Sequence, residues 1–563
     1  MQQSPFLTAS LSRRGSLILI AALVIWVAVL IIFAMPTDIV QGWMGWRQAD
    51  TQSIALNYYY GDEPIWRPQV NWGGITGFVE TEFPLYAWLA SQWMHFFGPK
   101  IQTTQYLSLA CAVFFVITIA VGFGRRYGLI PTAFAIFFIL SSRVVVYLAT
   151  SVQPDILSMA LYTVGFFNFC KFLRTRSGKV LFVSTIASVL AVWTKPLALN
   201  LGIAQAILIF CFYPTLLKDM RIWLSWGVIL SATSVWMLHA RSLYLEFGNT
   251  FGVLSGGDSK LPTLEKIQEP EIWISLFKNI LEWGVGLWSV PALLVVFGIL
   301  FLNSRYNPVR TKIPSVIQKL SDENFRFGVQ AIFALICASF AAVVLSIRYS
   351  HGDYGPHYHV WWILPAAWSV ALSIRLVMNT RTWHYSTIQF FNVKNSQFRS
   401  FLCISLILFS MTLIYARAFI FHVLERQSSA SFGENFTPLG QESFEVIRNQ
   451  NLKNWISAEW DPKKPLLLVR SLEPSRDVAW NTEHNYEDPR LFYWTRLRGW
   501  VIPSDDQTLE SLEYYAKQGA SWYIEPNKFK PLVALHVNQT YQDDRWSMQL
   551  ISDTANGRIY RLN

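Results

Sequence analysis

Charged residues are scarce in this chain. They make up 15% of its 563 residues, whereas hydrophobic residues make up 52% and the mean hydropathy is +0.29. A soluble globular domain is about a quarter charged, so the composition excludes an ordinary soluble protein and indicates a membrane protein with many spans. The five cysteines lie within apolar runs, without metal-type spacing. We therefore expect no disulfide to hold the outer parts of the protein together.

A continuous basic surface is also absent, although the net charge is +10. Lys and Arg concentrate in short loops between apolar runs, as the positive-inside rule requires of a membrane protein. They do not line one face that could follow a nucleic-acid backbone. The expected partner is therefore a lipid bilayer, and we expect no nucleic acid.

Apolar runs of bilayer-spanning length recur along residues 1–424. The first, 16–35, lacks a small-residue cleavage site and is interpreted as a retained span. An aromatic helix over 84–97 is expected to lie in the membrane interface. Ten later apolar runs lie near 103–123, 129–148, 155–173, 180–194, 197–213, 222–243, 283–303, 328–347, 358–374 and 401–422. Together with the first run they predict a mainly α-helical polytopic fold of about eleven spans.

The basic loops predict the orientation. The positive-inside rule places the N-terminus in the cytoplasm and the C-terminal region outside the inner membrane of the cell. From 425 to 563 the composition becomes that of a soluble domain, with strands expected over 465–472 and 521–526 and a helix over 509–519. An Asn-Gly turn predicts a closing hairpin near the C-terminus. The expected arrangement is a transmembrane catalytic domain, 1–424, and a small extracytoplasmic α/β domain, 425–563.

Apart from the basic residues of the inner loops, the ionisable residues at the edges of the spans fall on the predicted outer side, many of them in the first outer loop, 36–102. Charged groups at membrane depth are costly, so they usually face a cavity and act there. Carboxylates can accept a proton from a hydroxyl or hold a divalent cation, and Lys and Arg suit a phosphate headgroup. Aromatic side chains offer flat faces to a sugar ring. These groups together predict glycosyl transfer from a polyprenyl-phosphate sugar to an acceptor outside the membrane.

Simpler interpretations exist for several of these residues. Asp50 and Arg47 could form an ion pair on a helix surface. Asp155 could be a favourable helix N-terminal charge, and Lys195 could extend to lipid headgroups. A transporter or flippase of lipid-linked sugars would need similar groups, but it would show internal repeats and polar residues near the midplane. No repeat is evident, and the charges gather on one side, which favours an enzyme.

Five segments carry a family resemblance: WRQADT, TEFPLYAWL, QPDILSMAL, TKP and HGDYGPHYHVWWILP. In this order they resemble the membrane glycosyltransferases of superfamily C (GT-C). More narrowly, they resemble the protein O-mannosyltransferase-like group (glycosyltransferase family 39-like), which includes bacterial aminoarabinose transferases of lipid A. The resemblance covers roughly residues 16–375. It implies an undecaprenyl- or dolichyl-phosphate-linked donor, a glycan, lipid or protein acceptor, and inversion at the anomeric carbon.

The resemblance also assigns roles to residues. It implies that Asp50 is the catalytic carboxylate, accompanied by Glu82 and Asp155. Lipid A enzymes place a lysine directly after the loop glutamate, where this chain has Phe83, so other cations must bind the donor phosphate: Lys195, Arg241 and Arg348. The remaining substrate-binding candidates are Arg47, Tyr86, His351, Asp353 and His357. No cofactor is certain, but a divalent metal held by Glu82 and His239 is left open.

Overall fold

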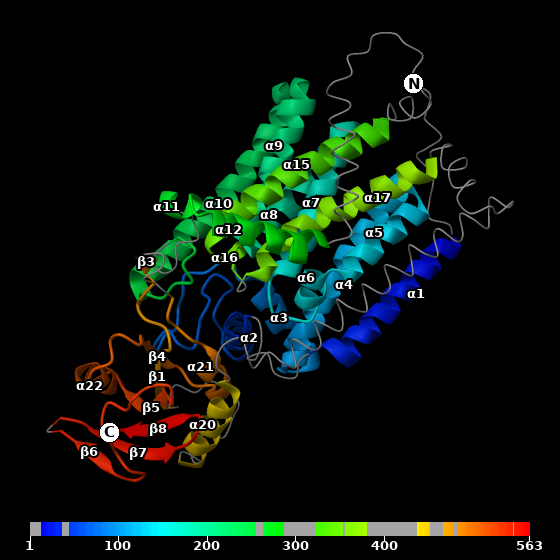
Figure 1. The fold of residues 1–563 in the computed structure, drawn as a ribbon. Helices are drawn as coiled ribbons and strands as arrows, with labels where there is room; N and C mark the ends of the chain where they lie inside the picture. The colour runs from blue at the N-terminus through cyan, green and yellow to red at the C-terminus, as the bar shows by residue number, and fades with distance from the viewer. Residues whose placement is uncertain are drawn as a thin grey trace, which may run out of the picture.

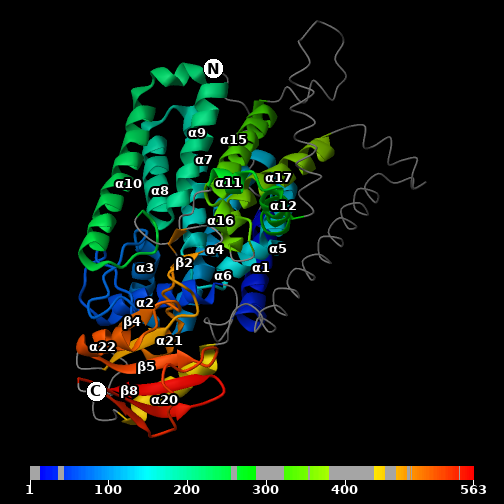
Figure 2. The same ribbon diagram turned by 60° about the vertical axis from the view of Figure 1, so that its left-hand side comes forward.

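The computed structural model describes residues 13–35, 44–254, 263–286, 323–352, 355–379, 436–450, 465–477, 482–483, 485–543 and 545–563. Apolar helices form a bundle, and a C-terminal unit with a β-sheet lies at one end of it (Figure 1). Loops and short helices of the first polar stretch lie between the two parts, as both views show (Figures 1 and 2).

The bundle helices follow the predicted apolar runs. Among the described residues, four helices are long and apolar enough to cross a membrane, or five if one bent pair of helices counts as a single span. The predicted run 401–422 and most of 283–303 lie outside the described residues, so the count of about eleven is supported only in part. The helices of the bundle are α1 (Arg13–Val29), α4 (Ile101–Tyr127), α5 (Leu129–Ser141), α6 (Arg143–Ala149), α7 (Asp155–Thr175), α8 (Gly178–Thr194), α9 (Asn200–Ile207), α10 (Met220–Phe247), α15 (Glu323–Leu345) and α17 (Ile363–Asn379).

Short helical segments extend or connect these helices. Apolar runs predicted as single spans over 16–35, 197–213 and 358–374 are each divided between an α-helix and a π- or 3-10 segment. The short helical segments of the described chain are η2 (Leu30–Ala34), η3 (Pro196–Leu199), η4 (Leu208–Phe212), η5 (Pro214–Lys218), α11 (Leu264–Ile267), α12 (Pro270–Asn279), η6 (Ile280–Val285), α16 (Ile347–Ser350) and η7 (Pro356–Trp362).

The predicted span over 129–148 is broken into α5 and α6, which meet at 67°. Ser142 between them has an extended backbone, and Arg143 follows it at the start of α6. The Arg143 guanidinium pairs with Glu282 and lies 3.8 Å from the centroid of the Trp283 ring. A cation within an apolar run requires partners of this kind. The break therefore falls at the residue that a straight apolar span would accommodate least well.

Two helices frame the first polar stretch, α2 (Gly45–Tyr60) and α3 (Leu85–Phe97). The expected helix over 84–97 is confirmed in α3. The sequence did not predict α2 as a helical element, because many of the residues that it buries are polar, among them Gln48, Asp50 and Gln52. Such a helix lacks the apolar periodicity by which an amphipathic helix is recognised.

The C-terminal unit contains a six-stranded mixed sheet, in the order β4-β1-β5-β8-β7-β6. Strand β1 is parallel to β4 and β5, whereas the pairs β5–β8, β8–β7 and β7–β6 are antiparallel. The strands are β1 (Leu466–Arg470), β4 (Gly499–Ile502), β5 (Ala520–Pro526), β6 (Thr540–Gln542), β7 (Ser547–Asp553) and β8 (Gly557–Leu562), and a separate two-stranded ladder joins β2 (Arg476–Asp477) to β3 (Thr482–Glu483).

Three helices accompany this sheet: α20 (Phe436–Gln450), α21 (Arg490–Thr495) and α22 (Leu509–Lys517). The predicted strands over 465–472 and 521–526, the helix over 509–519 and the closing hairpin are all present. Gly519 ends the helix with φ +103°, a conformation that favours glycine. The boundary at 425 lies outside the described residues and stays a prediction.

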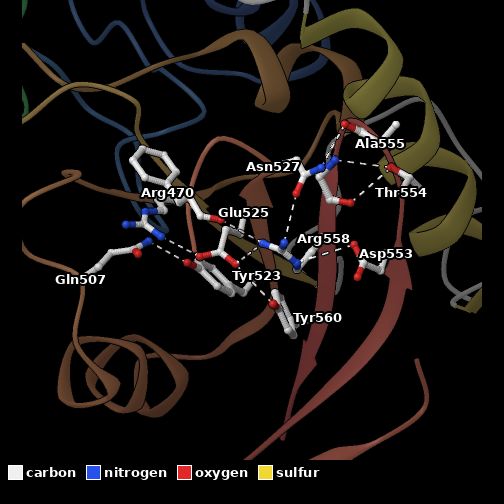
Figure 3. A network of polar contacts seen from close by, with 12 residues as sticks. Arg470, Gln507, Tyr523, Glu525, Asn527, Asp553, Thr554, Ala555, Arg558 and Tyr560 are labelled. Atoms are coloured by element: carbon white, nitrogen blue, oxygen red, sulfur yellow. Dashed lines mark hydrogen bonds and ion pairs between the residues drawn. The ribbon is translucent and has the colours of Figure 1, made fainter. Parts of the chain in front are cut away.

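A buried carboxylate joins three strands of this sheet (Figure 3). Glu525 on β5 accepts a hydrogen bond of 2.7 Å from Arg470 on β1 and lies 3.4 Å from a guanidinium nitrogen of Arg558 on β8. Tyr560 donates to the same carboxylate at 3.3 Å. Arg470 also lies 3.6 Å from the centroid of the Phe529 ring. The two arginines compensate the charge of the buried Glu525 carboxylate. Removing Glu525 would leave buried, unpaired cations and destabilise the sheet.

The C-terminal unit is fastened to the first polar stretch by backbone contacts. The N–H of Gly499 donates to the carbonyl of Asn71, and the N–H of Gly74 donates to the carbonyl of Gly499, at 2.9 and 2.7 Å. Arg498 donates to the side chain of Gln69 at 2.8 Å and to the carbonyl of Thr76 at 3.1 Å. The sheet therefore holds the loop on which the candidate site is built.

Candidate active site

Helix α2 presents Arg47 and Asp50 on one face, because residues three apart on a helix are neighbours. The Asp50 carboxylate is buried and accepts a hydrogen bond of 2.8 Å from the indole N–H of Trp72. Burial raises the pKa of Asp50 well above its ordinary value, although the Trp72 hydrogen bond and the charge of Arg47 act in the opposite direction. A carboxylate in such a setting is a stronger base than one in water.

Arg47 does not form its ion pair with Asp50. Its guanidinium pairs with Glu82 and also lies 5.2 Å from the centroid of the Phe251 ring. The predicted alternative for Asp50, a surface ion pair with Arg47, is therefore not what the structure contains. Glu82 is buried and lies near a second cation, with 3.9 Å between one of its oxygens and the Lys195 ammonium.

Lys195 connects the first polar stretch to the bundle. It lies in the turn between α8 and η3, and its ammonium is 3.5 Å from the carboxylate of Asp155, the first residue of α7. Burial lowers the pKa of Lys195 to about 8, while the charge of Asp155 acts in the opposite direction. His357 and Arg47 contribute to the electrostatic field at Asp155. The interpretation of Lys195 as a headgroup-directed surface charge does not fit a buried side chain between two carboxylates.

A cleft opens beside these groups. It contains about 360 Å³ of empty space, including the part that is open to the outside. Charged and apolar side chains share its lining, which consists of Arg47, Asp50, Thr51, Ile54, Thr81, Glu82, Phe83, Pro84, Tyr86, Ala87, Pro154 and Phe251. The cleft therefore joins a candidate base, a guanidinium and an aromatic ring within one small space.

One cleft residue, Phe251, comes from the segment after α10 and is held in place by Glu80. The buried Glu80 carboxylate accepts hydrogen bonds of 2.9 Å from the Thr250 hydroxyl and 3.0 Å from the N–H of Leu254. The backbone N–H of Phe251 donates to the Glu80 carbonyl at 3.0 Å. The Phe251 ring then packs edge-to-face on Trp72 at 5.8 Å. Glu80 therefore acts on the cleft through the segment that it anchors.

Among the remaining predicted residues that the structure describes, Tyr86 lines the cleft. The Tyr86 hydroxyl contacts Ser108 and donates to the Thr104 carbonyl at 3.2 Å. Arg241 is exposed on α10 and has no hydrogen bond or ion pair within the described part of the chain. Asp353 lies outside the described residues.

Arg348 and His351 lie near the end of α15 and make structural contacts there. Arg348 is buried, and its guanidinium pairs with Asp477 of β2 at 2.5 Å, which links the bundle to the C-terminal unit. One ring nitrogen of His351, Nδ1, lies 2.6 Å from the Ile347 carbonyl oxygen, and the His351 carbonyl accepts a hydrogen bond from Asn279 at 2.7 Å. Neither residue lines the cleft.

The predicted metal ligands, Glu82 and His239, each have another partner in the structure. His239 Nε2 lies 2.7 Å from the carbonyl oxygen of Trp66, and the Glu82 carboxylate faces Arg47 and Lys195. Over the residues that the structure describes, no group of three His, Cys, Asp or Glu side chains could hold a metal ion. The pairing of Glu82 with His239 at a metal stays a prediction.

Sequence reasoning missed Trp72 and Phe251, which contact Asp50 and Arg47. Aromatic residues are so frequent in this chain that neither position was distinguishable from a membrane-interface residue. The sequence also did not identify Asp477 as the partner of Arg348, because nothing in a local sequence shows that an acid pairs with a residue far away in the chain.

The bundle, the intervening loop and the C-terminal sheet form a fold that is also found in solved structures. No protein-family model and no curated protein matches the sequence. The chain is similar to the crystal structure of ArnT from Cupriavidus metallidurans in the apo state, with 12% identity, a TM-score of 0.56 and 97% of each chain covered.

Two further solved structures show the same fold. The structure of ArnT from Cupriavidus metallidurans bound to undecaprenyl phosphate has a TM-score of 0.55 at 12% identity, with 98% of each chain covered. The Archaeoglobus fulgidus oligosaccharyltransferase in complex with Zn and sulfate has a TM-score of 0.51 at 11% identity, over 90% of this chain and 67% of that one. At these identities the similarity establishes the fold, and the activity must be argued from the site.

Proposed function

We propose that this protein is an integral membrane glycosyltransferase that moves a sugar from a polyprenyl-phosphate donor to an acceptor. The observation that carries the proposal is the cleft, in which the buried Asp50 carboxylate, the Arg47 guanidinium and an aromatic ring share one space. Its position at the start of α7, a candidate span, suits a donor whose lipid tail stays in the bilayer. The similarity in fold to ArnT bound to undecaprenyl phosphate supports this donor class.

Asp50 is the proposed general base. It accepts the proton of the acceptor hydroxyl while that oxygen attacks the anomeric carbon, and the bond from that carbon to the phosphate oxygen breaks. Attack opposite the leaving phosphate inverts the anomeric carbon. The raised pKa of Asp50 suits this role, since a base works best when its pKa approaches the operating pH.

Arg47 and Lys195 are the proposed partners of the leaving phosphate. Arg47 lines the cleft, and Lys195 borders it through Glu82. Glu82 and Asp155 hold these two cations at a fixed separation, so the acids position the phosphate site. Arg348, a predicted donor-phosphate ligand, pairs with Asp477 instead, so we do not include it in the proposed phosphate site.

The proposed location is the inner membrane of the cell, with the N-terminus in the cytoplasm and the cleft and C-terminal domain outside. Support comes from the two ends of α4 and α7: the starts of both helices lie near the cleft, and their last turns carry Arg126 and Arg174. This distribution agrees with the positive-inside rule. The acceptor class, whether glycan, lipid or protein, is left open by the cleft.

The test uses the purified full-length protein in lipid nanodiscs. Undecaprenyl phosphate is the binding probe, measured by its effect on the unfolding temperature, and undecaprenyl-phosphate-linked sugars are the substrates, measured by release of free lipid phosphate. Asp50→Asn should abolish release and retain undecaprenyl phosphate binding. Near-normal release by this variant removes Asp50 as the base.

The rival activity, transport of lipid-linked sugars, is tested with the same purified protein reconstituted into proteoliposomes. Proteoliposomes with labelled donor in one leaflet would show donor movement without release of lipid phosphate if the protein were a flippase. A transferase releases lipid phosphate and needs an acceptor.

A further inference from the structure

A group of arginines lies at the end of the bundle opposite the cleft. Arg126 ends α4 and Arg174 ends α7. Counting 1.5 Å per helical residue, Arg174 is roughly 28 Å along α7 from Asp155, which is close to the thickness of a bilayer core. The group therefore lies at the level where the headgroups of the other leaflet are expected.

Arg126 and Arg174 share one aromatic surface. Their guanidinium carbons lie 5.0 and 4.7 Å from the centroid of the same buried ring, that of Phe327 on α15. Arg126 is also 5.4 Å from the Trp368 ring on α17. Because both distances are to the same centroid, the two guanidinium carbons lie within about 10 Å of each other. Two like charges are thus held close together by packing from several helices.

Neither of these guanidiniums forms an ion pair with a carboxylate in the described part of the chain. Glu323, at the start of α15, contributes to the electrostatic field at Arg174 without pairing with it. Arg375 approaches from α17 and donates to the Arg126 carbonyl at 3.0 Å. Arg126 is half-buried and Arg174 is exposed. The cluster is therefore positive overall, held in place by ring contacts and open to an anion from outside.

We propose that Arg126 and Arg174 bind the phosphate group of an anionic phospholipid from the leaflet opposite the cleft. Two planar guanidiniums can each donate to phosphate oxygens, and Phe327 and Trp368 keep them oriented when no lipid is bound. Basic sites between transmembrane helices recognise lipid headgroups in this way. A lipid source is favoured over soluble phosphate because both arginines end candidate membrane spans. This site is independent of the proposed transferase chemistry.

The test measures lipid retention by native mass spectrometry after the purified full-length protein is titrated in detergent with phosphatidylglycerol or with phosphatidylcholine. The double variant R126A/R174A should bind phosphatidylglycerol roughly thirtyfold more weakly, because each cation near an anionic lipid contributes about fivefold in affinity. The matched control is R125A/K171A, which removes the same charge from exposed positions on the same two helices, where no contact with the Phe327 or Trp368 ring is present among the described residues. It should bind like the wild type.

Folding is checked from the unfolding temperature without lipid, and R126K/R174K provides a second variant that retains the charge but loses the planar donor groups. That variant should bind with an intermediate affinity. Equal loss in R126A/R174A and R125A/K171A, or no loss in either, overturns the proposal. Inorganic phosphate is the second ligand arm: if it displaces phosphatidylglycerol from the wild type and protects that protein from unfolding equally well, the ligand is a soluble phosphate and the lipid assignment is wrong.

Discussion

Replacing Trp72 by Phe tests Asp50 as a base through a single hydrogen bond. The change removes the indole N–H that donates to the Asp50 carboxylate at 2.8 Å and keeps an aromatic ring against Phe251. A hydrogen bond to a charged group contributes about 1.5–3 kcal/mol, and about 1.4 kcal/mol corresponds to one pKa unit. Trp72→Phe should therefore raise the pKa of Asp50 further, by roughly one to two units.

The sign of the expected effect follows from the base mechanism. Only the ionised carboxylate accepts a proton, so activity falls as the pH falls through the pKa of Asp50. In Trp72→Phe the acid limb of the profile of kcat/KM against pH should move upward by about one to two pH units, with a smaller change on the alkaline side. Release of lipid phosphate from an undecaprenyl-phosphate-linked sugar is the assay.

Trp236→Phe is the matched control. Trp236 is equally buried, and its indole N–H donates at 3.1 Å to the carbonyl of Thr81, which also borders the cleft. It makes no hydrogen bond to Asp50 within the described residues, so its acid limb should stay at the wild-type pH. An unchanged acid limb in a folded Trp72→Phe protein, or an equal shift in both variants, would refute the reasoning.

Three other expectations follow from the same contacts. Lys195→Met should weaken undecaprenyl phosphate binding by about tenfold or more, while Lys100→Met, at an exposed position, should not; equal weakening would contradict the phosphate site. Glu80→Gln should increase hydrogen exchange at 249–254 and lower kcat, because it loosens the segment that carries Phe251; unchanged exchange would show that Glu80 does not anchor it. Glu525→Ala should lower the free energy of unfolding of the C-terminal unit by about 3–5 kcal/mol in urea titrations of the full protein, and a loss below about 1 kcal/mol would mean that the network is weakly coupled.

Much of the architecture was predictable because membrane spans depend on local composition. Apolar runs predicted α4, α7, α10 and α15 within a few residues, and alternating polarity and turn residues predicted the strands and hairpin of the C-terminal sheet. Breaks within helices were not predictable in the same way. The bend between α5 and α6 depends on the partners of Arg143, and those partners come from a part of the chain more than a hundred residues away.

The sequence predicted which residues belong to the candidate site, but it did not predict which of them form ion pairs with one another. The motif order identified Asp50, Glu82 and Asp155, and all three lie in or beside one cleft. Which cation compensates which acid was not readable, because an ion pair depends on distances between separate elements. Arg47 pairs with Glu82 instead of Asp50, and Arg348 pairs with Asp477 of the C-terminal unit.

The sequence by itself predicted a helical membrane protein, its apolar runs and the residues of the candidate site, since composition, span length and motif order are local properties. Only the tertiary structure decided the environment of each charge. Asp50 is buried and accepts a hydrogen bond from Trp72 of the following loop, and Lys195 lies between two carboxylates that α7 and the first loop bring to it. Burial and proximity across the fold set these properties, and no stretch of sequence contains either one.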